Sequence, residues 1–141
     1  MIFPAAVRRT GVDVSLVSYA KTVNVCLLGA RELEAQGISA EVVDLRSLKP
    51  LDGETVLRSV RKTGRLVVVH EASGLCGIAA EIAALVSAQA FFALRAPVLR
   101  LTGPDAPAPS SWVLEQAAVP QPDAVVKAVI GLMRGGADRA Y

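Results

Sequence analysis

Cysteine and histidine are scarce in this chain, and their scarcity excludes several kinds of site. Cys26 and Cys76 are the only cysteines among 141 residues, which is too few for a disulfide framework and gives no metal-ligand spacing. His70 is the only histidine, so a serine or cysteine nucleophile would have no other histidine as its base. We expect two reduced thiols and no bound metal. A reactive Cys76 at a helix amino terminus, where the helix dipole lowers a thiol pKa, is the alternative.

An excess of charge of either sign is also missing. Fifteen lysines and arginines are spread among thirteen acidic residues, and the net charge is +2, so no basic patch favours nucleic-acid binding. The amino terminus lacks a basic stretch followed by an apolar core, so no secretory signal is visible. The most apolar helical stretch is too short and too polar for a comfortable membrane span. We therefore expect a cytoplasmic protein that binds neither nucleic acid nor membranes.

Apolar residues are abundant, and one stretch organises them. Hydrophobic residues make up 52% of the chain, enough for one good core but hardly for two. Residues 66–71 (LVVVHE) contain four successive apolar residues, three of them β-branched, which favours a strand covered on both faces. The glycines that follow allow a tight turn before a helix. We predict the central strand of a parallel sheet, with His70 and Glu71 at its carboxyl end, where open α/β sheets present groups to ligands.

Strands and helices alternate along the rest of the chain. Thr22 and Asp52 are expected to cap helices at their starts, and Gly37 and Gly64 to end them. The predicted strands are 5–9, 12–18, 38–45, 65–71 and 98–102, and the further predicted helices are 78–94, 112–119 and 122–133. The alternation predicts one α/β domain, residues 1–134, with a mostly parallel sheet and helices on both faces. Residues 135–141 are expected to form a flexible tail.

The helix predicted at residues 78–94 is apolar on nearly every side. Glu81 is its only charged residue, and Ser87 and Gln89 are its only other polar residues. Because such a helix is buried on several sides, we expect its outer face to meet another subunit. The alternative is an ordinary core helix covered by the carboxyl-terminal segment. The candidate interface residues are His70, Glu71, Glu81, Ile82, Leu85, Gln89 and Arg95.

No catalytic, cofactor-binding or metal-binding residue is predicted from these patterns. His70 and Glu71 are neighbours on a strand, so their side chains point to opposite faces and converge only if the strand bulges. A structural or interface role is therefore favoured for His70. The turn from Gly74 to Gly77 has the location of a phosphate-binding loop. It lacks both the three glycines of the dinucleotide fingerprint and the Gly-Lys-Ser/Thr ending of the P-loop.

Several longer motifs resemble a known family. The matching segments include residues 40–52 (AEVVDLRSLKPLD), 59–72 (SVRKTGRLVVVHEA), 80–84 (AEIAA), 96–98 (APV) and 102–109 (TGPDAPAP). They resemble the carboxyl-terminal domain of the transketolase family, most of all that of the beta subunit of thiamine-dependent 2-oxo acid dehydrogenases. The resemblance runs from residue 5 to residue 133.

This resemblance implies a three-layer α/β/α domain whose five-stranded sheet has an antiparallel first strand. The implied complex decarboxylates pyruvate or a branched-chain 2-oxo acid on thiamine diphosphate with magnesium, and passes the acyl group to a lipoyl domain. Its chains imply three partners: a second beta-type chain, the alpha subunit and the lipoyl acyltransferase core. We expect a fragment of a longer subunit or the product of a split gene. A free-standing interaction module on the same fold is the alternative.

The family domain that contacts the thiamine pyrimidine ring has no counterpart in this sequence. No thiamine-binding residue can therefore be carried over, and the chain alone is expected to be inactive. Ala20 stands where the family has glycine, and residues 73–77 (SGLCG) replace its usual turn. Arg95 stands where the family often carries aspartate before Ala-Pro. This charge reversal is expected to weaken docking of a small basic domain of the acyltransferase, unless Arg95 is a solvated loop residue.

Overall fold

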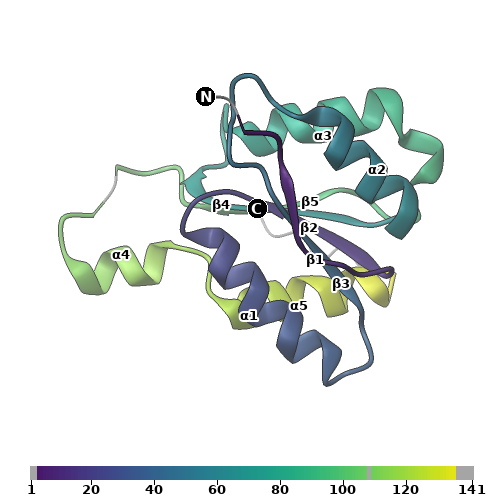
Figure 1. Cartoon of the computed structure of the whole chain (residues 1–141). Coiled ribbons are helices and arrows are strands. Elements are labelled where there is room, and N and C mark those ends of the chain that lie inside the picture. Colours follow the sequence, from purple (N-terminus) through teal and green to yellow (C-terminus); the bar gives the residue numbers. More distant parts are fainter. Residues whose placement is uncertain (1–2, 108, 136–141) are drawn as a thin grey trace.

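A five-stranded sheet lies between two layers of helices in the computed structural model, which describes residues 3–107 and 109–135 (Figure 1). The strands are β1 (Ala6–Arg9), β2 (Val14–Ser18), β3 (Ala40–Asp44), β4 (Leu66–Ser73) and β5 (Leu99–Gly103). The helices are α1 (Thr22–Glu34), α2 (Gly53–Thr63), α3 (Ile78–Gln89), the short 3-10 helix η1 (Phe91–Ala93), α4 (Trp112–Ala118) and α5 (Pro122–Met133). The predicted three-layer α/β/α architecture is confirmed. The predicted tail lies outside the described residues from position 136 onward.

The strand order is β1-β3-β2-β4-β5. β1 runs antiparallel to β3, as the family resemblance implies, and all other neighbours are parallel. β4 pairs with β2 on one side and β5 on the other, which confirms it as an inner strand. After β2 the chain crosses to β3 on one side, whereas after β4 it crosses to β5 on the other side. The direction of the connections therefore reverses between β2 and β4. Ligands bind at such a switch point in many open α/β sheets.

Each face of the sheet has its own apolar core. Val67 and Val69 of β4 pack into the core under α1 and α5, whereas Leu66 and Val68 pack into the core under α2 and α3. Alternate residues of β4 thus serve opposite faces, which explains why its sequence is apolar without a break. α5 packs beside α1 on the face opposite α3, so the carboxyl-terminal helix does not cover α3. None of the helices within the described ranges is long and apolar enough to cross a membrane.

Two predicted helix ends are confirmed. Asp52 precedes α2, and its Oδ1 accepts a hydrogen bond from the amide of Thr55 at 3.1 Å. Gly64 ends α2 with φ of +72°, a left-handed conformation that glycine adopts without steric cost. The structure therefore supports the predicted start and stop of α2 at these two residues.

Two other predicted ends were wrong. Thr22 is the first residue of α1 and caps nothing, because its hydroxyl is buried at the junction with β2, where it donates to the carbonyl of Tyr19 at 2.9 Å. The helix predicted at 78–94 ends at Gln89, and Ala90 (φ −137°) separates it from η1. The apolar composition continues to residue 94 without a glycine or proline, so the sequence contained no stop signal for α3.

Candidate interaction surfaces

Two aromatic rings fill the switch point at the carboxyl edge of the sheet. Tyr19 follows β2 directly, and His70 lies near the end of β4. Their ring centroids are 6.0 Å apart with an interplanar angle of 29°, a stacked arrangement. His70 has no exposed surface, and Tyr19 is half-buried. The position where an open α/β sheet commonly leaves a crevice is therefore occupied by side chains of the chain itself.

His70 and Glu71 do not form an acid–base pair. The register between β4 and β5 shifts between Val69 and Ser73, yet His70 remains buried while Glu71 is exposed. Neither ring nitrogen of His70 has a hydrogen-bond partner within the described residues. Burial lowers the pKa of His70, because a charged imidazolium is poorly solvated inside a protein. His70 is thus a neutral core residue at pH 7.

The turn between β4 and α3 is closed by an internal carboxylate. Oδ1 of Asp105 accepts hydrogen bonds from the hydroxyl of Ser73 and from the amide of Leu75, the latter at 3.1 Å. These bonds lower the pKa of Asp105, since they favour its charged form. A Cβ on Gly74 would lie 2.8 Å from the hydroxyl of Thr102. The amide that could face a phosphate therefore already binds an anion of the chain itself.

The residues at this edge do not fit thiamine diphosphate and its magnesium ion. The amide of Leu75 in this turn is already hydrogen-bonded to the carboxylate of Asp105, so it is not free to bind a phosphate oxygen. Within residues 3–107 and 109–135, no group of three or more His, Cys, Asp or Glu side chains could hold a metal ion. Cys26 is buried, which raises the pKa of its thiol to about 12, whereas Cys76 is exposed and unbonded.

The predicted interface residues separate into a buried and an exposed set. His70 and Ile82 have no exposed surface, so they support the surface from below and cannot themselves contact a partner in this conformation. Leu85 is half-buried, and its Cδ2 lies 2.8 Å from the position of a Cβ on Gly53. The exposed residues are Glu71, Glu81, Gln89 and Arg95.

The outer face of α3 is open despite the apolar composition of this helix. Only Ala79, Ile82 and Val86 are buried. The opposite side presents small uncharged side chains at Ala84 and Ala88. The exposed carboxylate of Glu81 lies on the same side. A helix face with a single charged residue and no covering element among the described residues is compatible with a subunit contact, which stays a prediction.

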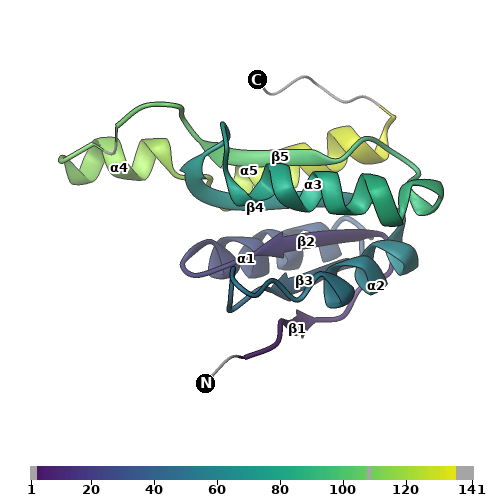
Figure 2. The same ribbon diagram turned by 90° about the horizontal axis from the view of Figure 1, so that it is seen from above.

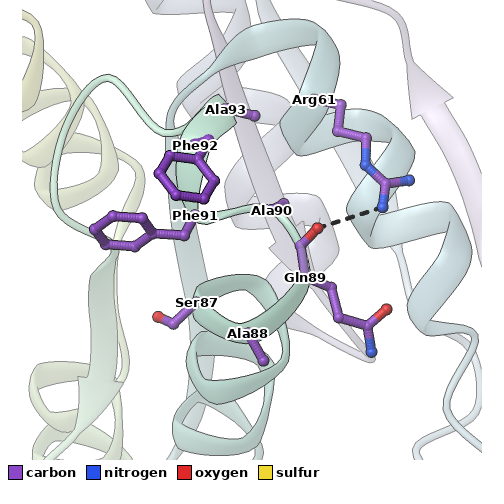
Figure 3. A pocket seen from close by; sticks show the side chains of 8 residues that line it. All are labelled: Arg61, Ser87, Ala88, Gln89, Ala90, Phe91, Phe92 and Ala93. Atoms are coloured by element: carbon purple, nitrogen blue, oxygen red, sulfur yellow. Dashed lines mark hydrogen bonds between the residues drawn. The ribbon is translucent and has the colours of Figure 1, made fainter.

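A shallow hollow of about 480 Å³ lies where α3 gives way to η1. Figure 3 shows the rings of Phe91 and Phe92 on one side of this hollow and the guanidinium of Arg61 on the other. The remaining lining residues are Ser87, Ala88, Gln89, Ala90 and Ala93. Arg61 is thus the only charged residue among the described residues that line the hollow.

A projecting helix forms a third surface, which sequence reasoning missed. Figures 1 and 2 show α4 extending away from the body of the domain. Trp112, Val113 and Leu114 at its start are 70%, 72% and 58% exposed. An ion pair of 3.5 Å joins Glu115 of α4 to Lys21, the residue before α1. The sequence signal for this surface was a run of three large apolar residues shortly after a proline-rich segment. Such a segment cannot join a central strand, so the residues after it lie beyond the sheet.

Arg95 lies at the opposite edge of the sheet from the Asp105 turn. Its amide donates to the carbonyl of Gly64 at 2.7 Å. Its Cδ and Cγ lie 2.8 and 2.9 Å from the position of a Cβ on Gly64, so the arginine stem rests on the end of α2. The Arg95 side chain is nonetheless exposed, which leaves its charge available at the surface.

Comparisons with known proteins agree on one family. The family described as "Transketolase, C-terminal domain" matches residues 4–125. The chain is 44% identical over 129 residues to the beta subunit of acetoin:2,6-dichlorophenolindophenol oxidoreductase from Bacillus subtilis (strain 168), covering 92% of this chain and 38% of that subunit. It is 46% identical over 125 residues to the pyruvate dehydrogenase E1 component subunit beta of Rhizobium meliloti (strain 1021), covering 89% of this chain and 27% of that subunit.

Solved structures give the same result. A structure described as "Split gene transketolase, inactive beta4 tetramer" superimposes with a TM-score of 0.81 at 31% identity, covering 93% of this chain and 42% of that one. A 2-oxoglutarate:ferredoxin oxidoreductase from Magnetococcus marinus has a TM-score of 0.65 at 12% identity, which shows a shared fold alone. The chain spans between 27% and 42% of the length of the first three proteins.

Proposed function

Because this chain belongs to the transketolase C-terminal domain family, we propose that it is the carboxyl-terminal assembly domain of the beta subunit of a 2-oxo acid dehydrogenase decarboxylase component. The observation that carries this proposal is an identity of 44% and 46% to two beta subunits over about nine tenths of the chain. Fold similarity alone would not suffice, because one fold serves many functions.

In this proposal the chain contributes surfaces and no chemistry. Thiamine diphosphate with magnesium would be held by other parts of the complex, because the turn at residues 73–77 is closed by Asp105. The solved relative described as an inactive tetramer of beta chains supports a domain that assembles without being active by itself. A cytoplasmic location is part of the same proposal.

The domain offers separate surfaces for its proposed partners. The outer face of α3, around Ala84, is assigned to a second beta-type chain. The exposed apolar start of α4, at Trp112 to Leu114, is assigned to the thiamine-binding part of the complex, including the alpha subunit. The acyltransferase core is the third partner. Its docking is proposed to be weak in this chain, because Arg95 adds a positive charge where a basic domain would approach.

Reconstitution tests this function. The 141-residue chain is mixed with the alpha subunit and the amino-terminal part of the beta subunit from the same organism, and turnover of pyruvate, branched-chain 2-oxo acids and acetoin is measured. Turnover is expected only when all components are present, and a Trp112→Ser chain should restore less of it. An Arg31→Ser chain, changed on exposed α1, is the control.

Two results would contradict the proposal. Equal turnover without the chain would favour a free-standing interaction module on the same fold. Micromolar binding of thiamine diphosphate and magnesium to the chain alone, measured by titration calorimetry, would show that the Asp105 turn opens to accept a diphosphate.

A further inference from the structure

The hollow at the end of α3 carries two exposed aromatic rings. Phe92 is 100% exposed and Phe91 is 61% exposed, and their rings form an edge-to-face pair with centroids 5.5 Å apart and an interplanar angle of 83°. Neighbouring large apolar residues are seldom this open to solvent unless they serve a contact. Ala90, directly before their short 3-10 helix, is 5% exposed and packs into the core. The backbone that carries the two rings is therefore held against the domain.

One arginine lines the same hollow and a second lies near it. Arg61 lines it, and among the described residues its guanidinium has two long contacts. One is to the carboxylate of Glu54 at 3.4 Å, and the other is to the carbonyl of Gln89 at 3.5 Å (Figure 3). Arg95 follows η1 by two residues and rests on Gly64, one turn beyond Arg61. Within the described ranges Arg95 forms no ion pair. Arg95 is therefore available to an approaching anion, and Arg61 becomes available where an anion displaces its exposed contact with Glu54.

We propose that this hollow is a docking site for an acidic protein segment that carries an aromatic or aliphatic anchor residue. The anchor fills the concave space beside Phe91 and Phe92, and flanking carboxylates pair with Arg61 and Arg95. Aromatic residues and arginine are the side chains that dominate the binding energy of protein interfaces. This site goes beyond the assembly function proposed above: Arg95 also appears in that function, whereas Phe91, Phe92 and Arg61 do not.

Two other occupants fit the hollow less well. In a second copy bound around a two-fold axis the same patch would face itself, so Arg61 and Arg95 would meet a patch with the same two positive charges, and like charges disfavour a contact. An anionic membrane offers the right charge, but a flat lipid surface cannot fill a concave hollow, and the net charge of the chain is only +2. Charge and shape together favour a protein segment.

Fluorescence anisotropy with synthetic peptides tests the proposal. The probe is a labelled short peptide of Asp, Glu and Ser with one central Phe and one central Leu. We expect saturable binding to the 141-residue chain that weakens as salt is added. Phe92→Ala and Arg61→Glu should each weaken binding by about tenfold or more. Arg31→Glu, on the opposite face of the sheet, should leave it unchanged. Thermal melting confirms that each variant folds.

Peptide variants and vesicles separate the possible occupants. A peptide with serine in place of Phe and Leu, and one with lysine in place of the acids, should both bind at least about tenfold more weakly. Equal binding of the lysine peptide, or unchanged binding by Phe92→Ala, would overturn the proposal. Binding to phosphatidylserine vesicles in the absence of peptide binding would also overturn it, in favour of a membrane contact. Self-association that Phe92→Ala abolishes would overturn it in favour of a second copy.

Discussion

The imidazole of His70 stacks on the phenol ring of Tyr19 at a centroid distance of 6.0 Å. His70 belongs to β4, and Tyr19 directly follows the adjacent strand β2. The connections of these two strands run in opposite directions. Burial raises the pKa of Tyr19 as it lowers that of His70, so both rings are neutral at pH 7. The stacked rings therefore fill the middle of this sheet edge with uncharged side chains. Partners are expected to bind at the surfaces around it.

Replacement of His70 by leucine should reduce the pH dependence of stability. The folded pKa of His70 lies below its ordinary value of 6.5, so the unfolded chain takes up a proton first as pH falls. The free energy of unfolding should thus decrease below about pH 6.5 in the parent chain and less in His70→Leu. Urea denaturation at several pH values measures this, and identical slopes in the two chains would contradict it.

Replacement of Ala20 by glycine should stabilise the domain. Ala20 has φ of +50° directly after β2, a left-handed conformation that costs an L-residue about 1–2 kcal/mol. Ala20→Gly should therefore raise the free energy of unfolding by about 1 kcal/mol. The control is Ala128→Gly in α5, where glycine should instead cost about 0.5–1 kcal/mol. A loss of stability in both variants would show that Ala20 is not strained.

Lys62 should contribute far more to the free energy of unfolding than its neighbour Arg61. Glu41 is 2% exposed, and its carboxylate pairs with Lys62 and accepts from the amide of Gly11 at 3.3 Å. Lys62→Ala leaves a buried charge unpaired, at a cost of about 3 kcal/mol. Arg61→Ala removes an exposed pair with Glu54 and should cost less than about 1 kcal/mol. Thermal or urea unfolding compares them, and equal losses would disagree with this ranking.

Self-association should depend on the outer face of α3. The chain is expected to sediment as a dimer at micromolar concentration, because this face carries one charged residue, Glu81, and no other element of the described residues covers it. Ala84→Arg places a charge in the middle of the contact and should shift the chain toward monomer. Ala35→Arg, on an exposed position after α1, should not. A parent chain that is monomeric throughout the concentration range would exclude this surface as a subunit contact.

Docking of a basic subunit-binding domain should improve in Arg95→Asp. Loss of one partner of a desolvated interfacial charge pair costs about 2–5 kcal/mol, and like charges add repulsion. Binding of such a domain at low salt is therefore expected to be stronger for Arg95→Asp than for the parent, with Arg134→Asp as a control. If the parent binds as tightly as Arg95→Asp, Arg95 lies outside the docking surface.

Short sequence patterns predicted the parts of the fold that depend on residues close together in the chain, namely β4 and the two ends of α2. The unbroken apolar run of β4 indicated burial on both faces, and Asp52 and Gly64 indicated the ends of α2, because each acts through its own backbone neighbours. The end of α3 at Gln89 could not be predicted in this way, since composition alone does not distinguish a helix from the 3-10 turn that follows it.

The candidate surfaces depended more on tertiary structure. The buried state of His70 and the link between Asp105 and the turn join residues that are far apart in sequence, so no window of sequence contains them. The exposure of Trp112 depends on the direction of the proline-rich segment before it. The sequence predicted that this segment is extended but did not predict its direction.

The Asp105 carboxylate links two connections of the sheet that are far apart in sequence. It belongs to the segment that leads from β5 toward α4, and it holds Ser73 and Leu75 of the turn that leads from β4 into α3. Any displacement of that segment must either break these hydrogen bonds or carry the turn along with it. A partner that displaces Asp105 would therefore also release the turn that begins α3.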